Sequence, residues 1–344
     1  MSRTLSICLL AWALPGVTLA QDDVPSAGAL VDSLFRVIRS ESVHRGTVRW
    51  DSVESRFRGE LVRAADYADS LAAFRTVFEA LGDVHSSVLH EGRQLNYFRP
   101  ASSEEAARVG PLVEAANARR GVIENRLLEG NVGYVAVPTI YTSGPEEMVE
   151  YAERIRERAC ALAARGATRW IVDLRLNMGG NMHPMLTGLG PLIGDGPIGG
   201  LVGAEGEEVA RWSIEGGVNH AEGAPMVALD GSPCELEVGQ PIAVLLGPVT
   251  MSSGQIVAIA LAGRPRTRSF GESTADGYTT ANEWKQVRPD LALNLSVAFT
   301  MDRTGRVYER VVEPDEVVTG ADDFDQPADD PKVRAALDWL GRQP

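Results

Sequence analysis

The sequence predicts an α/β protein with parallel strands, preceded by a helical region. An apolar run, an amphipathic segment and a second apolar run follow one another between residues 132 and 174, which is typical of a strand–helix–strand unit. A right-handed crossover in such a unit makes the two strands parallel. The loop after the second strand then lies at the carboxyl edge of the sheet, where open α/β folds assemble their functional sites.

The first 20 residues predict a signal peptide. Arg3 stands near the start, residues 5–14 form an apolar stretch, and Thr18 and Ala20 suit a cleavage site before Gln21. The stretch is too short to span a bilayer, and no later segment approaches the roughly 20 apolar residues that a spanning helix needs. The mature chain is therefore expected to be exported, to the periplasm or to the outside of the cell.

Composition narrows the range of partners. The 344 residues carry a formal net charge of -14, which disfavours nucleic acid and anionic membranes as partners because both would be repelled. The chain has only two lysines, Lys285 and Lys332. Cys160 and Cys234 remain after loss of the signal peptide, at a spacing that matches no metal motif, and the sequence favours neither a disulfide nor two free thiols.

The remaining chain predicts a cap, a connection and a core. Residues 21–91 form an N-terminal helical cap, because apolar side chains recur there at helical spacing. Residues 92–129 are polar and irregular and are interpreted as a connecting segment with a short helix at 102–108. The core then runs from residue 130 to 344 and ends in a helix.

Three elements open the core. Residues 132–140 predict a strand, and residues 145–165 predict an amphipathic helix that ends at Gly166. Residues 170–174 predict a second, buried strand. Further along, the apolar run 241–246 predicts another buried strand.

A serine-bearing turn follows that last strand. Thr250, Ser252 and Ser253 precede an apolar helix that begins near Ile256. Backbone N–H groups at a helix N-terminus point toward whatever a serine there attacks, so Ser252 is the candidate nucleophile. A plain N-cap is the alternative, because Ser and Thr are typical of that position.

A glycine pair lies in the loop after the strand at 170–174. The N–H groups of Gly179 and Gly180 can approach a ligand closely, since no side chain intervenes, and could stabilise a developing oxyanion. The alternative is a simple turn. Asp173 and Arg175 are expected to form an ion pair that fixes this loop.

Of the five histidines, His85 is the candidate general base. It lies beside Asp83 and Ser86 in a short polar break at the end of the helical cap. A capping or exposed histidine is the alternative, and His183, which follows the glycine pair, is the rival base.

Together these segments resemble the C-terminal processing, or tail-specific, serine peptidases. The family's D-L-R-x-N-x-G-G motif stands at Asp173–Gly180, and its T-x-S motif at Thr250–Ser252. Gly271–Gly277 looks like the family's Gly-Glu-x-Thr loop, and Val312–Asp315 looks like its closing Pro-Asp element. The similarity covers about residues 130 to 320, and several motifs in the right order are far more specific than one.

The resemblance implies a Clp-protease/crotonase-like α/β core and hydrolysis of protein or peptide substrates. It implies a Ser252 nucleophile and an oxyanion hole built from Gly179, Gly180 and the N–H of Ser253. No metal and no cofactor are expected.

Two departures from the family refine this interpretation. Well-known members pair the serine with a lysine 25 residues later, but that position is Gly277 here and Lys285 lies further on. Lysine-free relatives, such as the tricorn core protease and a secreted chlamydial protease, use a histidine ahead of the core and a glutamate shortly before the Pro-Asp element. His85 and Glu309 stand at those places, with Glu313 as the rival glutamate.

The second departure is a missing segment. The family's peptide-binding PDZ insert needs more room than residues 92–120 provide, so the core or the cap must recognise the substrate. Gln255 also stands where the family usually has glutamate.

Two other functions compete with peptide hydrolysis. A non-catalytic lipid- or peptide-binding protein of the same fold would have no need for Ser252, His85 and the glycine pair together. An α/β-hydrolase esterase fits poorly, because Thr250 stands where its G-x-S-x-G motif requires glycine.

Overall fold

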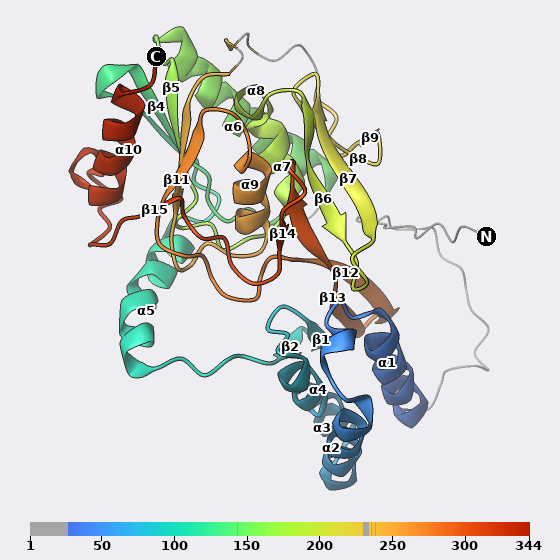
Figure 1. Ribbon diagram of the computed structural model, residues 1–344. Helices are drawn as coiled ribbons and strands as arrows, with labels where there is room; N and C mark the ends of the chain where they lie inside the picture. Colours follow the sequence, from blue (N-terminus) through green and yellow to red (C-terminus); the bar gives the residue numbers. More distant parts are fainter. Residues whose placement is uncertain (1–26, 143, 230–233, 235, 238) are drawn as a thin grey trace. The chain divides into compact units, whose positions relative to one another are not determined.

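The computed structural model describes residues 27–142, 144–229, 234, 236–237 and 239–344. The predicted signal peptide lies outside these residues. The chain divides into two compact units (Figure 1). Of the described residues, the first comprises Ala27–Pro100 with Val202–Val209 and Thr280–Phe299, and the second comprises those within Ala101–Leu201, Ala210–Thr279 and Thr300–Pro344. A late segment of the chain, Thr280–Phe299, therefore folds with the N-terminal helices.

Four helices form most of the first unit: α1 (Ala27–Glu41), α2 (Trp50–Arg63), α3 (Tyr67–Ala72) and α4 (Phe74–Leu81), with a single turn η1 (Arg45–Thr47) between α1 and α2. Their apolar faces meet around Phe57, whose ring lies 4.9 Å from that of Phe35 and 4.8 Å from that of Phe74. The predicted helical periodicity is thus explained by a shared core. Helix α4 ends at Gly82, which takes the left-handed conformation at φ 65° that favours glycine.

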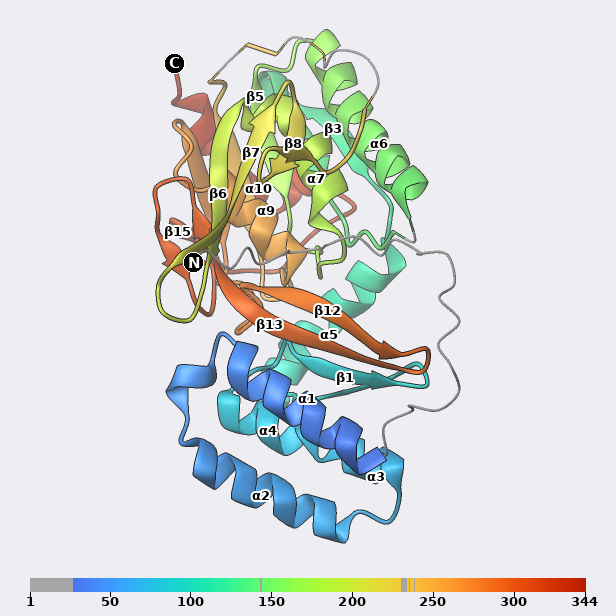
Figure 2. The same ribbon diagram turned by 90° about the vertical axis from the view of Figure 1, so that its right-hand side faces the viewer.

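The first unit also contains an antiparallel sheet. Its strands are β1 (Ser87–His90), β2 (Arg93–Asn96), β12 (Thr280–Arg288) and the first nine residues of β13 (Leu291–Asp302). They are ordered β2-β1-β13-β12, with helices α1 to α4 on one side (Figure 2). A bulge after Ala281 puts Asn282 opposite Ser296.

The second unit is built on a six-stranded sheet. Its strands are β3 (Glu124–Leu128), β4 (Val132–Ala136), β5 (Arg169–Asp173), β10 (Ile242–Leu246), β11 (Thr267–Gly271) and β15 (Glu316–Val317), in the order β15-β11-β10-β5-β4-β3. All neighbours from β15 to β4 are parallel, and only β3 is antiparallel. The predicted parallel pair of β4 and β5 is confirmed. Strands β5 and β10 are neighbours, so their carboxyl ends meet at one edge.

Helices cover both faces of this sheet. The helices of the second unit are α5 (Ser103–Ala118), α6 (Pro145–Ala164), α7 (Met182–Gly188), α8 (Gly190–Ile193), α9 (Ser253–Leu261) and α10 (Pro331–Gly341), with short turns η2 (Glu129–Asn131) and η3 (Pro327–Asp329). Helix α10 lies on one face, and α6 and α9 lie on the other (Figure 1). All five side chains of β10 are buried, as expected for a parallel strand covered on both faces. Helix α5 is longer than the predicted helix at 102–108.

The second unit holds further strands, although Val202 of β6 and the first two residues of β7 belong to the first unit. They are β6 (Gly196–Val202), β7 (Glu208–Glu215), β8 (Val218–Ala221), β9 (Ala224–Pro225) and β14 (Val307–Tyr308). Strand β14 pairs with Thr300 and Met301, the part of β13 that belongs to this unit.

Candidate active site

Ser252 has a backbone conformation that serine rarely adopts. It joins β10 to α9 with φ 52° and ψ -125°, in the positive-φ region that disfavours side chains. Such strain, of order 1–3 kcal/mol, persists only where the surroundings enforce it, and it occurs preferentially at functional sites. The nucleophile of α/β hydrolases sits on a comparable sharp strand-to-helix turn.

Thr250 holds this turn against the neighbouring strand. Its hydroxyl donates to the carbonyl of Leu174 at 2.8 Å and accepts the N–H of Gly247 at 3.1 Å. The threonine of the T-x-S motif is therefore a structural residue that ties the end of β10 to the end of β5.

The glycine pair packs directly against Ser252. A Cβ added to Gly179 would lie only 2.7 Å from the Cβ of Ser252, and one added to Gly180 would lie 2.0 Å from the carbonyl oxygen of Ile140. Both glycines have positive φ, 104° and 108°. Close approach and backbone conformation therefore both require glycine here.

The N–H groups around Ser252 differ in what they contact. The N–H of Gly179 donates to Oδ1 of Asn177 at 2.9 Å, so a side chain already accepts it. Gly180 is exposed, and its carbonyl accepts the hydroxyl of Ser253 at 2.7 Å. Ser253 is the first residue of α9, where an N–H has no acceptor within its own helix.

A buried ionic cluster anchors the glycine loop. Arg175, 2% exposed, donates to Asp173, Asp322 and Asp330, each at 2.6 Å for the shortest contact. The predicted ion pair of Asp173 and Arg175 is confirmed. Burial alone would raise the pKa of Asp330, but the charge of Arg175 lowers it below its ordinary value. Asp330 also caps α10 by accepting the N–H groups of Lys332 and Val333.

The other two family motifs bond to the serine turn. The N–H of Ala275 donates to the carbonyl of Thr250 at 3.0 Å, and Gln255 donates to Thr274 at 2.6 Å. Thr274 in turn accepts the N–H of Val312 at 2.8 Å. Gln255 thus links the Gly-Glu-x-Thr loop to the serine helix, and Thr274 links that loop to the Pro-Asp element.

His85 belongs to the first unit, where its contacts are polar. Its Nδ1 lies 2.8 Å from the hydroxyl of Thr280, and its backbone carbonyl accepts from Asn282 at 3.0 Å and from Asn294 at 3.2 Å. Burial lowers the pKa of His85 to about 4, against the opposing charge of Asp83. The imidazole is therefore neutral at physiological pH, as a general base must be.

The two glutamate candidates lie in the second unit with exposed side chains. Glu313 accepts a hydrogen bond from Ser273. Glu309 follows β14, and within the described part of the chain it has no hydrogen-bond or ion-pair partner.

The two rival bases are engaged elsewhere. His183 is buried in α7 with Nδ1 2.8 Å from Asn219, and burial lowers its pKa. Lys285 on β12 pairs with Glu41 and Glu283, each at 2.8 Å. Burial would lower the pKa of Lys285, but these carboxylates raise it above its ordinary value, so the amine stays charged at neutral pH.

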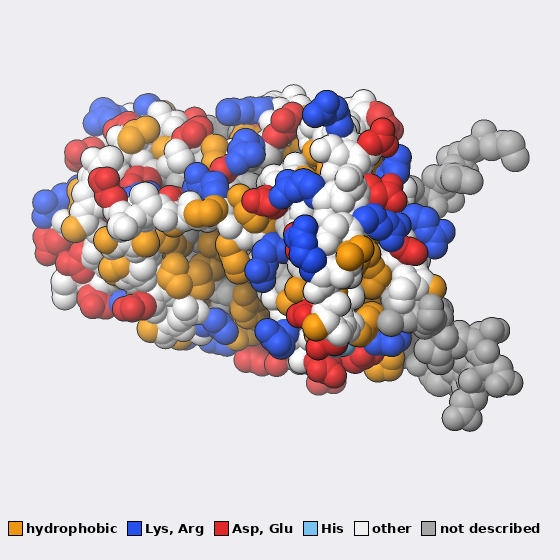
Figure 3. All heavy atoms as spheres, turned by 90° about the horizontal axis from the view of Figure 1, so that it is seen from below, with side chains coloured by type: hydrophobic (Ala, Val, Ile, Leu, Met, Phe, Trp, Pro, Cys, Tyr) orange, Lys and Arg blue, Asp and Glu red, His pale blue; other side chains and the backbone are white. Residues whose placement is uncertain are grey.

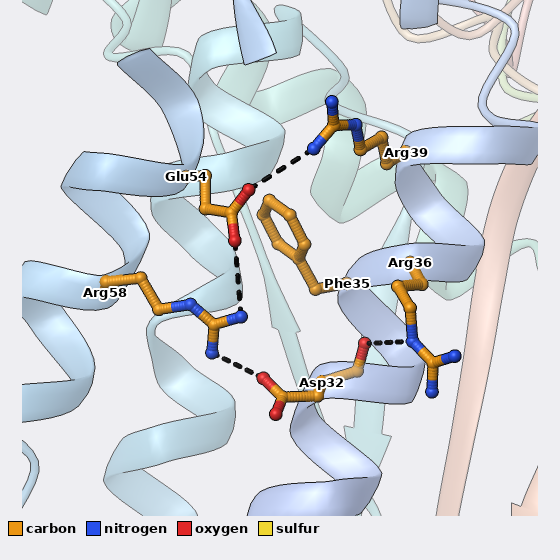
Figure 4. Close-up of a pocket in the computed structure, with 6 residues that line it drawn as sticks. All are labelled: Asp32, Phe35, Arg36, Arg39, Glu54 and Arg58. Atoms are coloured by element: carbon orange, nitrogen blue, oxygen red, sulfur yellow. Dashed lines mark hydrogen bonds and ion pairs between the residues drawn. The ribbon is translucent and has the colours of Figure 1, made fainter. Parts of the chain in front are cut away.

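A surface pocket in the first unit is a further candidate. It is lined by residues of α1 and α2, namely Asp32, Phe35, Arg36, Arg39, Glu54 and Arg58 (Figure 4). Glu54 lies 3.3 Å from both Arg39 and Arg58, so the charges compensate one another above an apolar ring. The pocket holds no nucleophile and is not the catalytic site. On the face shown in Figure 3, acidic and basic side chains are likewise interspersed.

Thr280 and Asn282 were not identified from the sequence. Both lie at the start of β12, far from His85 in the chain, and only the sheet brings them close to it. The available signal was local: Asp83 accepts the N–H groups of His85 and Ser86, a turn typical of Asp-x-x-Ser sequences.

Three further observations concern the chemical setting. Cys160 and Cys234 form a disulfide, a bond typical of oxidising compartments, which resolves the open question about these thiols. No helix in the described ranges is long and apolar enough to cross a membrane. The described residues also contain no cluster of three or more His, Cys, Asp or Glu side chains suited to a metal ion.

A serine on a strained turn, faced by paired glycines, matches the family that the sequence motifs indicate. Residues 131–318 match peptidase family S41, and because this is more than half of the chain, the protein belongs to that family. It is similar to a nisin-resistance protein of Lactococcus lactis subsp. lactis, with 25% identity over 272 residues that span 77% of this chain and 75% of the relative.

Solved structures share the fold. A lipoprotein from Streptococcus agalactiae matches with a TM-score of 0.70 and 20% identity, over 94% of this chain and 99% of the other. A putative peptidase from Parabacteroides merdae matches with a TM-score of 0.59 and 14% identity, over 92% and 97%. The photosystem II D1 C-terminal processing protease matches with a TM-score of 0.53 and 15% identity, over 86% and 94%. The predicted fold is confirmed.

Proposed function

We propose that this protein is an exported serine endopeptidase in which Ser252 attacks the scissile carbonyl. The observation that carries the proposal is the strained backbone of Ser252 directly beside Gly179. A plain N-cap would require neither the positive φ nor a neighbour without a side chain. The reaction forms a covalent acyl-enzyme, which water then hydrolyses.

The oxyanion hole is assigned to the loop of Gly179 and Gly180 and to the N–H of Ser253. Since Gly179 already donates to Asn177, we assign direct donation to Gly180 and Ser253. Gly179 then contributes the space for the serine side chain. One such donor is worth roughly 3 to 4 kcal/mol of transition-state stabilisation in known hydrolases.

His85 is the proposed general base, and Glu309 is the proposed acidic residue that stabilises the imidazolium. Burial lowers the pKa of His85 to about 4, so the ring is unprotonated at neutral pH, which is the form in which a general base acts. Glu313 is the rival residue for the position of Glu309. Lys285 is set aside because its ion pairs keep it protonated.

The substrate is proposed to be a protein or peptide outside the cytoplasm. The predicted signal peptide and the Cys160–Cys234 disulfide support export. The nisin-resistance relative suggests nisin as the first peptide to test. The net charge of -14 suits a basic peptide better than an acidic one.

Labelling with a fluorophosphonate serine probe tests the nucleophile, with the modified peptide mapped by mass spectrometry. Ser252→Ala should abolish labelling and peptide cleavage, whereas Ser253→Ala should keep much of both, because a backbone donor survives side-chain truncation. If the Ser252→Ala variant were active, Ser252 would not be the nucleophile. A wild-type protein that binds peptides but neither labels nor cleaves would be a binding protein of the same fold.

A further inference from the structure

Asp83 is a buried carboxylate without a cation. It is 1% exposed, and within the described ranges no arginine or lysine lies within ion-pair distance of it. It accepts the backbone N–H groups of His85 at 3.0 Å and Ser86 at 2.9 Å. The hydroxyls of Ser86 and Ser296 also donate to it, at 2.5 Å and 3.1 Å. A buried carboxylate needs such donors, and here they come from dipoles rather than from a counterion.

Two hydroxyl groups connect this carboxylate to the imidazole of His85. The Oγ of Ser296 lies 3.1 Å from Oγ1 of Thr280, which in turn lies 2.8 Å from Nδ1 of His85. Thr280 is 1% exposed and Ser296 is fully buried, so bulk water does not compete for these contacts. The chain of atoms is continuous within the first unit.

The carboxylate fixes the direction of every hydrogen bond in this chain. A carboxylate only accepts, so Ser296 donates its single proton to Asp83 and can only accept from Thr280. The 3.1 Å contact between Ser296 and Thr280 is then a hydrogen bond only if Thr280 donates its proton to Ser296, and in that arrangement Thr280 offers a lone pair to Nδ1. In this arrangement His85 carries its proton on Nδ1, and Nε2 is the unprotonated ring nitrogen.

Asn282 reinforces the same direction. Its amide nitrogen donates to the carbonyl of His85, so its Oδ1 faces the hydroxyls. That oxygen lies 3.2 Å from Oγ1 of Thr280 and is a second acceptor for the threonine proton. With either Ser296 or Asn282 as the acceptor, a lone pair of Thr280 faces Nδ1. The bulge after Ala281 makes this possible, because it aligns Asn282 with Ser296 instead of Val297.

We propose that Asp83, acting through Ser296 and Thr280, is the positioning group that holds His85 in the Nδ1–H tautomer. The inference rests on the proposed role of His85 as general base. In serine triads an acid bonded directly to the imidazole fixes the tautomer, and loss of that acid leaves the ring in the wrong one. Here two hydroxyls transmit the same constraint. The proposed role of Glu309 is then only to stabilise the imidazolium through its negative charge, because Asp83 already orients the ring.

The experiment measures the tautomer directly. The full chain is labelled with ¹⁵N-histidine, and two-bond ¹⁵N–¹H spectra at neutral pH report which ring nitrogen carries the proton. The His85→Ala variant assigns the signals. Thr280→Val removes the hydroxyl with little change in volume, and Thr280→Ser is the matched control that keeps it. Peptide cleavage is followed in parallel as kcat and KM.

In the wild type and in Thr280→Ser, Nδ1 of His85 should be protonated and Nε2 unprotonated. Thr280→Val should populate the other tautomer and lower kcat about 10- to 100-fold, the loss expected for one hydrogen bond to a group that becomes charged, with KM little changed. An Nε2–H tautomer in the wild type overturns the proposal, and so does a Thr280→Val variant with unchanged tautomer and kcat.

The two proposals fail in different ways. A wild-type protein that neither labels nor cleaves would refute the peptidase function but leave the tautomer result valid. If Thr280→Val does not fold, the wild-type spectrum still decides between the two tautomers.

Discussion

The two units each bury a carboxylate next to a proposed functional loop, but they neutralise it in opposite ways. In the second unit Asp173 is paired with Arg175, and the cluster extends to Asp322 and Asp330. In the first unit Asp83 receives only backbone and hydroxyl donors. In an ion pair, the partner's charge compensates the carboxylate directly, and the pair can hold a loop in place. A carboxylate bound only by hydroxyls and N–H groups instead orients the hydroxyl protons, and so sets the direction of the hydrogen bonds that those hydroxyls make with other groups. The first arrangement suits a scaffold, and the second suits the control of an imidazole.

Removal of the imidazole should have the largest effect. His85→Ala should lower kcat/KM about 10²- to 10⁴-fold, the usual contribution of a general base, with little change in Tm. Steady-state kinetics on purified protein measure this. Lys285→Ala is the control, because its surface ion pairs leave it no role in the reaction. If Lys285→Ala abolished activity while His85→Ala kept it, the Ser/His assignment would be wrong and a Ser/Lys dyad would take its place.

Removal of the cation from the second unit should act on stability instead. Arg175→Met leaves Asp173 and Asp330 buried without their partner, which should cost about 3–5 kcal/mol in the free energy of unfolding. Urea denaturation with circular dichroism measures this cost. Arg56→Met, which breaks the exposed pair with Glu79, is the matched control and should cost less than about 1 kcal/mol. If both variants lost the same free energy of unfolding, the buried cluster would stabilise the fold no more than an exposed ion pair does.

The pH dependence should separate His85 from an ordinary histidine. Its pKa of about 4 lies below the unperturbed value of about 6.5. The base form thus persists as pH falls, and kcat/KM should decline only as pH approaches 4. The same shift makes stability fall as pH drops below about 6.5, because the unfolded chain takes up the proton first. A kinetic limb near 6.5 would contradict the burial of this ring.

The smallest effect is expected from the exposed glutamate. Glu309→Gln should lower kcat less than about tenfold, since an exposed carboxylate acts on the imidazolium only through screened charge. Glu313→Gln serves as the comparison and should behave like the wild type. A loss as large as that of His85→Ala would make Glu309 the true third member of the site.

The sequence predicted the elements of this fold better than its polar contacts. Strands β5 and β10 were predictable because both are short buried apolar runs, and the parallel pairing of β4 with β5 follows from the crossover rule. Ser252 and the glycine pair were predictable because their motifs depend on local backbone geometry. That Asn177 accepts the N–H of Gly179 depends on a side-chain rotamer, which no pattern encodes.

The surroundings of His85 could not be predicted for a different reason. Thr280 and Ser296 reach it through strand pairing and a bulge, and a shift of one residue would replace Ser296 by Val297. Serine and threonine are also common in strands and turns, so their presence at these positions did not indicate a contact with His85. Asp83 was noticed only as a neighbour of His85, because its partners lie far along the chain.

That separation has a consequence for the stage of synthesis at which the proposed peptidase could become active. The bond between Ser296 and Asp83 closes a loop of 213 residues, so it forms only after most of the chain has been synthesised. Until the hairpin of β12 and β13 arrives, a nascent chain already carries His85 but cannot fix its tautomer. Long-range pairing of this kind is also slow to form. If His85 is the general base as proposed, the order of synthesis delays peptidase activity until the chain is nearly complete, and a chain that ends before Thr280 should contain Ser252 but lack the contacts that fix the tautomer of His85.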